Sequence, residues 1–337
     1  MIYQNVELHN VAEVRNMPEH GGVRLQRVPE EIRVQLEKAG PRALAPACAE
    51  IRFVTRNQHA RVTLSCPEGE ALAIPFYGLF QGRQQVRIGA EPVTVEMTGT
   101  EGLWDLDRSA WEHMPFSPRV FRLFLGGSPV VLQDLEGDEI RPPTAEELPS
   151  LRYLAYGTSI THGGAASYPH LCYVARTARC LGADLINLGM GGSAYCEKAL
   201  ADYIAARQDW HLATLALSVN MIGAEFDLDT FYERVSYMVD TVAGANTERP
   251  VACITIYPHF RDFPGIPPQP QLKGRPDEYR QRLRDAVAAC PHPNVHLIEG
   301  EDILSDIGGL TCDLIHPGDD GMIRMGENLA ARLKSLL

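Results

Sequence analysis

The chain has 337 residues, 45% of them hydrophobic and 22% charged, which is typical of a folded protein long enough for two domains. Its formal net charge of −12 disfavours nucleic acids and anionic membranes as partners, because both repel an acidic protein. No apolar run reaches about 18 residues, and residues 1–10 lack the pattern of a secretory signal. The eight cysteines are scattered and indicate reduced thiols, so we expect a cytoplasmic protein.

The part of the chain up to residue 145 indicates antiparallel β-structure. Short runs rich in β-branched residues alternate with Gly, Pro and Asn, as in a β-sandwich or jelly roll. The segment Pro29–Gly40 fits either a helix or a strand with a turn. Gly137–Ser150 contains three prolines and indicates a connector, so we predict domains at 1–145 and 146–337. The expected strands are Ala49–Arg56, Ala60–Cys66, Ala71–Gly78, Gln84–Gly89, Pro92–Met97, Arg119–Gly126 and Pro129–Gly137.

The second part alternates between apolar strand-like runs and amphipathic helical stretches. This pattern predicts a five-stranded parallel sheet with helices on both faces, a three-layer α/β/α domain. The expected strands are Arg152–Tyr156, Asp184–Leu188, Thr214–Ser218, Val251–Tyr257 and Val295–Glu299. The expected helices are Tyr168–Leu181, Tyr195–Arg207, Asp229–Ala243, Pro276–Ala289 and Asp320–Leu336.

Residues suited to acyl transfer lie in the loops expected at the carboxyl edge of this sheet, where ligands bind in such folds. Ser159 follows the first strand, Asn220 follows the third, and Asp313 and His316 follow the last. A serine hydroxyl needs a base to become a nucleophile, and a histidine can supply it. Asp313 can hold the other ring nitrogen of His316 and fix its tautomer.

A tetrahedral intermediate also needs hydrogen-bond donors for its oxyanion. The backbone N–H groups of Ser159 and Gly192, together with the amide of Asn220, supply three. Gly192 belongs to the glycine-rich stretch after the second strand, in which Gly189 and Gly191 are alternative donors.

Each of these side chains also has a purely structural interpretation. Ser159 could end a strand, Asn220 could form an Asx turn, Asp313 could cap a turn and His316 could begin a helix. Their order after successive strands favours the catalytic interpretation. His162 lies close to the serine, but no residue is placed to orient it, so we expect a polar loop residue.

Four sequence blocks carry a family resemblance: "YGTSITHG" with Ser159, "NLGMGG" with Gly192, "SVNM" with Asn220, and "DLIHP" with Asp313 and His316. Over residues 150–337 the chain resembles the SGNH hydrolases, also called GDSL esterases and lipases. The resemblance implies Ser159, Asp313 and His316 as catalytic residues. It implies an oxyanion hole made by Ser159, Gly192 and Asn220.

The chain departs from the family pattern at two places. Thr158 stands where the family usually has Asp before the serine. In the third block Ser218 replaces a glycine, and Met221 follows the asparagine in place of Asp. The four residues that name the family are kept, so the departures concern the substrate class and leave the hydrolytic chemistry in place.

A β-rich domain ahead of an SGNH domain is similar to the layout of some carbohydrate esterases. We therefore expect a serine esterase that hydrolyses short, acetyl-type esters of a carbohydrate or glycoside, with an SGNH acyltransferase as the alternative. We expect a small-molecule ester as partner, no nucleic acid, no membrane and no cofactor; a homo-oligomer is compatible with the sequence. His162 and His259 lack ligands at metal spacing, so we expect no metal. The proline-rich segment Pro258–Pro276 is a candidate pocket wall or lid.

Overall fold

The computed structural model describes residues 1–267 and 269–337, which form two compact units. The first unit comprises Met1–Glu30, Ala43–Leu151 and Gly182–Asp184, and the second comprises Glu31–Arg42, Arg152–Leu181 and Leu185–Leu337. The domain boundary between residues 145 and 146 stays a prediction. It assigns Glu31–Arg42 to the first domain. This segment lies in the β-rich part of the sequence and yet folds with the second unit.

The first unit contains two antiparallel sheets whose inward side chains form one core. Ile51 and Phe53 enter this core from one sheet, and Val62 and Leu64 enter it from the other, so the unit is the expected β-sandwich. The first sheet has the order β1 (Ile2–Tyr3), β2 (Val6–His9), β5 (Ala49–Phe53), β11 (Phe121–Gly127), β7 (Ala71–Tyr77) and β8 (Phe80–Gln81), and β9 (Val86–Ile88) also pairs with β7. The second has the order β10 (Val93–Thr98), β6 (His59–Ser65), β12 (Val131–Gly137), β4 (Gly22–Gln26) and β3 (Glu13–Met17).

A buried ionic group stabilises the first sheet. The carboxylate of Glu50 on β5 accepts hydrogen bonds from Arg52 at 2.9 and 3.0 Å and from Arg122 at 2.7 and 2.8 Å. All three side chains are buried. Burial by itself would raise the pKa of Glu50, but the two guanidinium groups hold that pKa far below its ordinary value. The carboxylate is therefore charged in the folded protein.

Short helical elements complete the first 150 residues. The segment Pro29–Gly40, which the sequence left open, contains one helical turn and no strand. The elements are η1 (Pro18–His20), α1 (Glu30–Arg33), η2 (Pro41–Leu44), α2 (Glu101–Trp104), η3 (Arg108–Ala110) and η4 (Ala145–Glu147).

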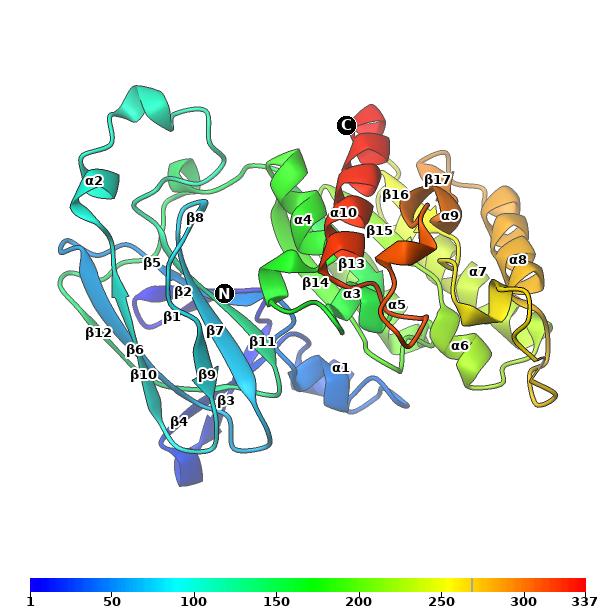
Figure 1. Ribbon diagram of the computed structural model, residues 1–337, viewed down its shortest axis with the longest axis horizontal. Coiled ribbons are helices and arrows are strands. Elements are labelled where there is room, and N and C mark those ends of the chain that lie inside the picture. Colours follow the sequence, from blue (N-terminus) through cyan, green and yellow to red (C-terminus); the bar gives the residue numbers. More distant parts are fainter. Residues whose placement is uncertain (268) are drawn as a thin grey trace. The chain divides into compact units, whose positions relative to one another are not determined.

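The second unit contains the five-stranded parallel sheet that the sequence predicts (Figure 1). Every position of β15 and β16 is buried, as expected for strands covered on both faces. The third expected strand, Thr214–Ser218, begins and ends two residues too late, because the apolar run Leu212–Leu217 marks neither end of the paired segment. The sheet order is β14 (Asp184–Gly189), β13 (Arg152–Gly157), β15 (Leu212–Ala216), β16 (Val251–Ile254) and β17 (Val295–Ile298).

Helices cover both faces of this sheet (Figure 1). On one face α4 (Tyr173–Leu181) packs against α10 (Asp319–Leu333). On the other, α7 (Leu228–Gly244) packs against both α5 (Lys198–Ala206) and α8 (Pro276–Ala289). None of the helices among the described residues is both long and apolar enough to cross a membrane. Shorter elements are α3 (Ser159–His162), η5 (Pro169–Leu171), α6 (Val219–Gly223), η6 (Phe260–Asp262), α9 (Gly300–Ile303), η7 (Ile307–Gly309) and η8 (Lys334–Leu336).

Candidate active site

Ser159 lies at a sharp turn between β13 and α3, at the carboxyl edge of the sheet. A side chain at Gly157 would collide with the hydroxyl of Thr161, so glycine allows the strand to turn directly into the helix. Thr158, the first departure from the family pattern, is buried, and its Oγ1 accepts a hydrogen bond from the N–H of Ile160 at 3.4 Å. Thr158 therefore caps the short helix that begins with Ser159.

Three of the expected site residues form a continuous hydrogen-bonded chain. Ser159 Oγ lies 2.7 Å from His316 Nε2, and His316 Nδ1 lies 2.7 Å from Asp313 Oδ2. Because a carboxylate can only accept, the proton between His316 and Asp313 belongs to Nδ1. Nε2 is then free to accept the proton of the Ser159 hydroxyl.

Asp313 is itself held by its own loop. Its Oδ1 accepts hydrogen bonds from the Thr311 hydroxyl at 2.9 Å and from the N–H groups of Ile315 at 2.8 Å and His316 at 2.9 Å. Burial would raise the pKa of Asp313, but hydrogen bonds from His316, Ile315 and Thr311 hold it well below its ordinary value. Asp313 thus stays ionised wherever the imidazole can act as a base.

Asn220 lies at the start of α6, on the same pocket as Ser159. Its Oδ1 accepts a hydrogen bond from the N–H of Ala194 at 3.2 Å, which leaves its amide nitrogen as a donor toward the pocket. Ser218, the second departure from the family pattern, donates its hydroxyl to the carbonyl of Ala194. Ser218 and Asn220 therefore both bind the glycine-rich loop through one residue, while Met221 is buried in the core.

The structure narrows the choice among the three glycines. The N–H of Gly189 donates to Asn187 Oδ1 at 2.8 Å, and Gly189 does not line the pocket, so it is a poor oxyanion donor. Gly191 and Gly192 both line the pocket. Gly192 has a φ of 71°, which favours glycine over other residues. Gly192 remains the predicted donor, with Gly191 as the alternative.

The pocket has a volume of about 550 Å³ and includes three residues that the sequence reasoning missed. Tyr195 follows the glycine-rich loop, and Arg261 lies in the expected wall segment Pro258–Pro276, of which residue 268 is outside the described residues. Arg42 comes from the segment Glu31–Arg42, and no local pattern indicated it. His162, the last residue of α3, lines the pocket, and its Nδ1 lies 3.0 Å from the carbonyl oxygen of Gly189.

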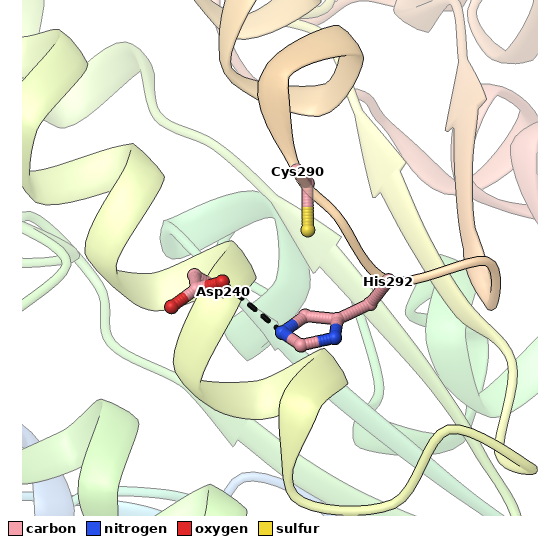
Figure 2. A group of neighbouring side chains, drawn as sticks. All are labelled: Asp240, Cys290 and His292. Atoms are coloured by element: carbon pink, nitrogen blue, oxygen red, sulfur yellow. Dashed lines mark ion pairs between the residues drawn. The ribbon is translucent and has the colours of Figure 1, made fainter.

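Among the described residues, one group of possible metal ligands lies outside the Ser159 pocket. Asp240, Cys290 and His292 have ligand atoms within 4.8 Å of one another, and Figure 2 shows the thiol directed toward the space beside the other two. His292 Nε2 already pairs with Asp240 at 3.1 Å, and three ligands are one fewer than a closed tetrahedral zinc site has. We interpret the group as an ion pair beside a thiol. None of its members lines the Ser159 pocket.

The fold is that of an α/β/α protein, and the site contains the residue types of a serine acylhydrolase. A family model described as GDSL-like Lipase/Acylhydrolase matches residues 152–334, and the chain therefore belongs to this family. A comparison with curated protein sequences finds no significant match.

Three solved structures show the same fold at low sequence identity. A salicylyl-acyltransferase from a tetracycline biosynthetic pathway is 16% identical, with a TM-score of 0.81 over 99% of this chain and 95% of that one. A putative GDSL-like lipase from Bacteroides ovatus is 17% identical, with a TM-score of 0.71 over 99% and 96%. A family two carbohydrate esterase from Cellvibrio japonicus is 13% identical, with a TM-score of 0.63 over 99% and 96%.

Proposed function

We propose that the protein is a serine esterase that hydrolyses short-chain esters through an acyl-enzyme on Ser159. The observation that carries the proposal is the chain of two 2.7 Å hydrogen bonds from Ser159 through His316 to Asp313. Ser159 Oγ attacks the ester carbonyl carbon while His316 Nε2 takes the hydroxyl proton. The oxyanion then receives hydrogen bonds from the N–H groups of Ser159 and Gly192 and from the amide of Asn220.

Collapse of this intermediate releases the alcohol and leaves the acyl group on Ser159. His316 gives its proton to the leaving oxygen, so the alcohol departs neutral. A water molecule then attacks the acyl carbonyl while Nε2 takes one of its protons, and a second collapse returns the hydroxyl to Ser159 and frees the acid. Asp313 stabilises the imidazolium at both stages and stays ionised throughout.

A small second hollow beside the pocket supports a short acyl group. Val219 and Ile315 line both hollows and so form a partition between them. The second hollow has a volume of about 10 Å³, roughly the space that one water needs. This hollow therefore adds no space for an acyl chain beyond the pocket itself, which favours a short acyl group.

For the alcohol part we propose a carbohydrate or glycoside. The support is that a β-sandwich precedes the catalytic unit here and that family two carbohydrate esterases share this fold over most of the chain. An acyltransferase is the second candidate, favoured by the salicylyl-acyltransferase, which matches with a TM-score of 0.81. The same residues would then transfer the acyl group from Ser159 to an alcohol in place of water.

The test is a series of p-nitrophenyl esters from acetate to palmitate, with the wild type, Ser159→Ala and Ser335→Ala side by side. Ser335 is exposed near the end of the chain and serves as the matched control. We expect turnover of short chains only, lost in Ser159→Ala and kept in Ser335→Ala. Turnover that survives Ser159→Ala contradicts the proposal. Adding alcohols and measuring the ratio of new ester to free acid distinguishes the acyltransferase.

A further inference from the structure

Among the described residues, the pocket that contains Ser159 is lined by basic side chains and by no acidic ones. Arg42 and Arg261 line it, and no Asp or Glu is found among the described residues that line it. The chain as a whole has 43 acidic and 31 basic residues, so the composition of this pocket is opposite to that of the protein. A pocket with one sign of charge concentrates ligands of the other sign.

Arg42 is carried to the pocket by a segment that is firmly attached to the second unit. The buried carboxylate of Glu197 accepts three backbone hydrogen bonds from this segment, from Glu37 at 2.7 Å, Lys38 at 3.0 Å and Ala39 at 3.1 Å. Arg42 follows three residues later in η2. The Glu197 carboxylate thus fixes the backbone of the segment three residues before Arg42.

Arg261 is half-buried in η6 and is held without a carboxylate. Its Nε donates to Gln269 Oε1 at 3.0 Å, and its guanidinium lies 4.4 Å from the ring of Phe260. Its two terminal nitrogens make no hydrogen bond or ion pair with the described residues. The neighbouring Asp262 is bound instead by Arg280, at 2.8 Å on each oxygen.

The charge of Arg261 is thus partly desolvated and is paired with no carboxylate among the described residues. Burial lowers the pKa of Arg261, although a guanidinium remains charged in proteins. A partly buried charge is unfavourable unless it is paired. An anion that binds in the pocket would therefore remove part of the free-energy cost of burying Arg261.

We propose that the alcohol part of the ester carries a carboxylate or phosphate group and that Arg42 and Arg261 bind it. The inference rests on the proposed function, in which the acyl part is short, so the arginines act on the remainder of the substrate. Guanidinium groups bind both anions by paired hydrogen bonds. The substrate class is therefore an acylated acidic sugar or a similar acidic alcohol, in place of a neutral glycoside.

The experiment compares three sugars that carry one acetyl group on the same hydroxyl: glucose, glucuronate and glucose 6-phosphate. They differ only at the sixth carbon, so the neutral, carboxylate and phosphate forms are matched. We expect kcat/KM for at least one anionic form to exceed that of glucose by about tenfold or more, as for a hydrogen bond to a charged group. The anion with the higher kcat/KM shows whether the substrate carries a carboxylate or a phosphate. Added salt should reduce the preference for the anionic forms.

Variants test the two arginines. Arg42→Gln and Arg261→Gln should each lower the ratio of anionic to neutral kcat/KM, and Arg42→Lys and Arg261→Lys should restore part of it. Arg282→Gln is the control, because Arg282 lies on α8, pairs with Asp229 and does not line the pocket. It should leave the ratio unchanged.

The same acetylated sugars are titrated into Ser159→Ala by calorimetry, so that the preference is measured without turnover. The inference is overturned if neither anionic form binds, or if both bind no more tightly than the glucose form. The proposed function fails separately, if Ser159→Ala still hydrolyses p-nitrophenyl acetate. A preference that survives both glutamine variants also overturns the roles given to Arg42 and Arg261.

Discussion

Replacing Asp313 by Asn tests how the site controls the tautomer of His316. Oδ1 of Asp313 accepts three hydrogen bonds, from Thr311, Ile315 and His316, so the oxygen of an asparagine must stay on that side. Its NH2 group then faces His316 Nδ1, where Oδ2 now accepts at 2.7 Å. Nδ1 must become the acceptor, the ring proton moves to Nε2, and Nε2 can no longer take the proton of Ser159.

The magnitude follows from this complete loss of the base. We expect Asp313→Asn to lower kcat by about 10⁴-fold, the effect of the wrong tautomer in serine hydrolases. That factor corresponds to about 5 kcal/mol of transition-state stabilisation. The unfolding free energy should change little, because the three hydrogen bonds to the side-chain oxygen are kept.

The assay is p-nitrophenyl acetate hydrolysis across a range of pH, with Asp306→Asn as the matched control. Asp306 caps the N–H of Gly308 in a similar turn and has no contact with His316. Because the pKa of Asp313 is held well below its ordinary value, its protonation contributes only at very low pH. A folded Asp313→Asn that loses less than about tenfold in kcat refutes the assigned role of the carboxylate.

Four further predictions follow from the same contacts. Asn220→Ala should lower kcat by about 10²–10³-fold with little change in KM, and an unchanged kcat would remove Asn220 from the oxyanion hole. Val219→Ala should join the two hollows and raise turnover of p-nitrophenyl butyrate relative to acetate; a constant ratio contradicts the partition. Glu50→Gln should cost about 3–5 kcal/mol in urea unfolding, because buried Arg122 loses the carboxylate that it binds and buried Arg52 keeps only its pairing with Asp184. Since folding lowers the pKa of Glu50, its contribution is present above the ordinary carboxylate pKa and declines as pH falls; equal acid sensitivity of wild type and Glu50→Gln contradicts this. EDTA should leave esterase activity unchanged, and a loss restored by zinc would point to a metal requirement.

The strands of the catalytic unit were predictable because burial on both faces produces uninterrupted apolar runs. The same property limits the prediction of strand ends. In β15 the run continues through Leu217, so the sequence offers no mark at Ala216, where the ladder ends. In Pro29–Gly40 the apolar residues Ile32, Val34 and Leu36 alternate with polar ones as in a strand, so the helical turn at Glu30–Arg33 could not be distinguished from a strand with a turn.

The site was predictable where topology alone brings residues together. Ser159 and Asn220 follow parallel strands, whose carboxyl ends meet at one edge. The glycine that donates to the oxyanion was not predictable, because each of the three glycines tolerates the same backbone conformations. Only the three-dimensional structure, which shows the N–H of Gly189 bound to the side chain of Asn187, removes one of them as an oxyanion donor.

Arg42 shows why specificity is harder to predict than chemistry. The family model matches residues 152–334, and Arg42 lies outside them. Its position depends on Glu197, whose carboxylate must be buried against three N–H groups of a distant segment. No periodicity in the sequence encodes that contact. The residues proposed for acyl transfer thus lie within the range that the family model matches, whereas Arg42, one of the two arginines proposed to bind the substrate, lies in a segment outside it. Relatives with counterparts of Ser159 and His316 but none of Glu197 should hydrolyse neutral esters. Assays with the three acetylated sugars would then show no preference for the anionic forms.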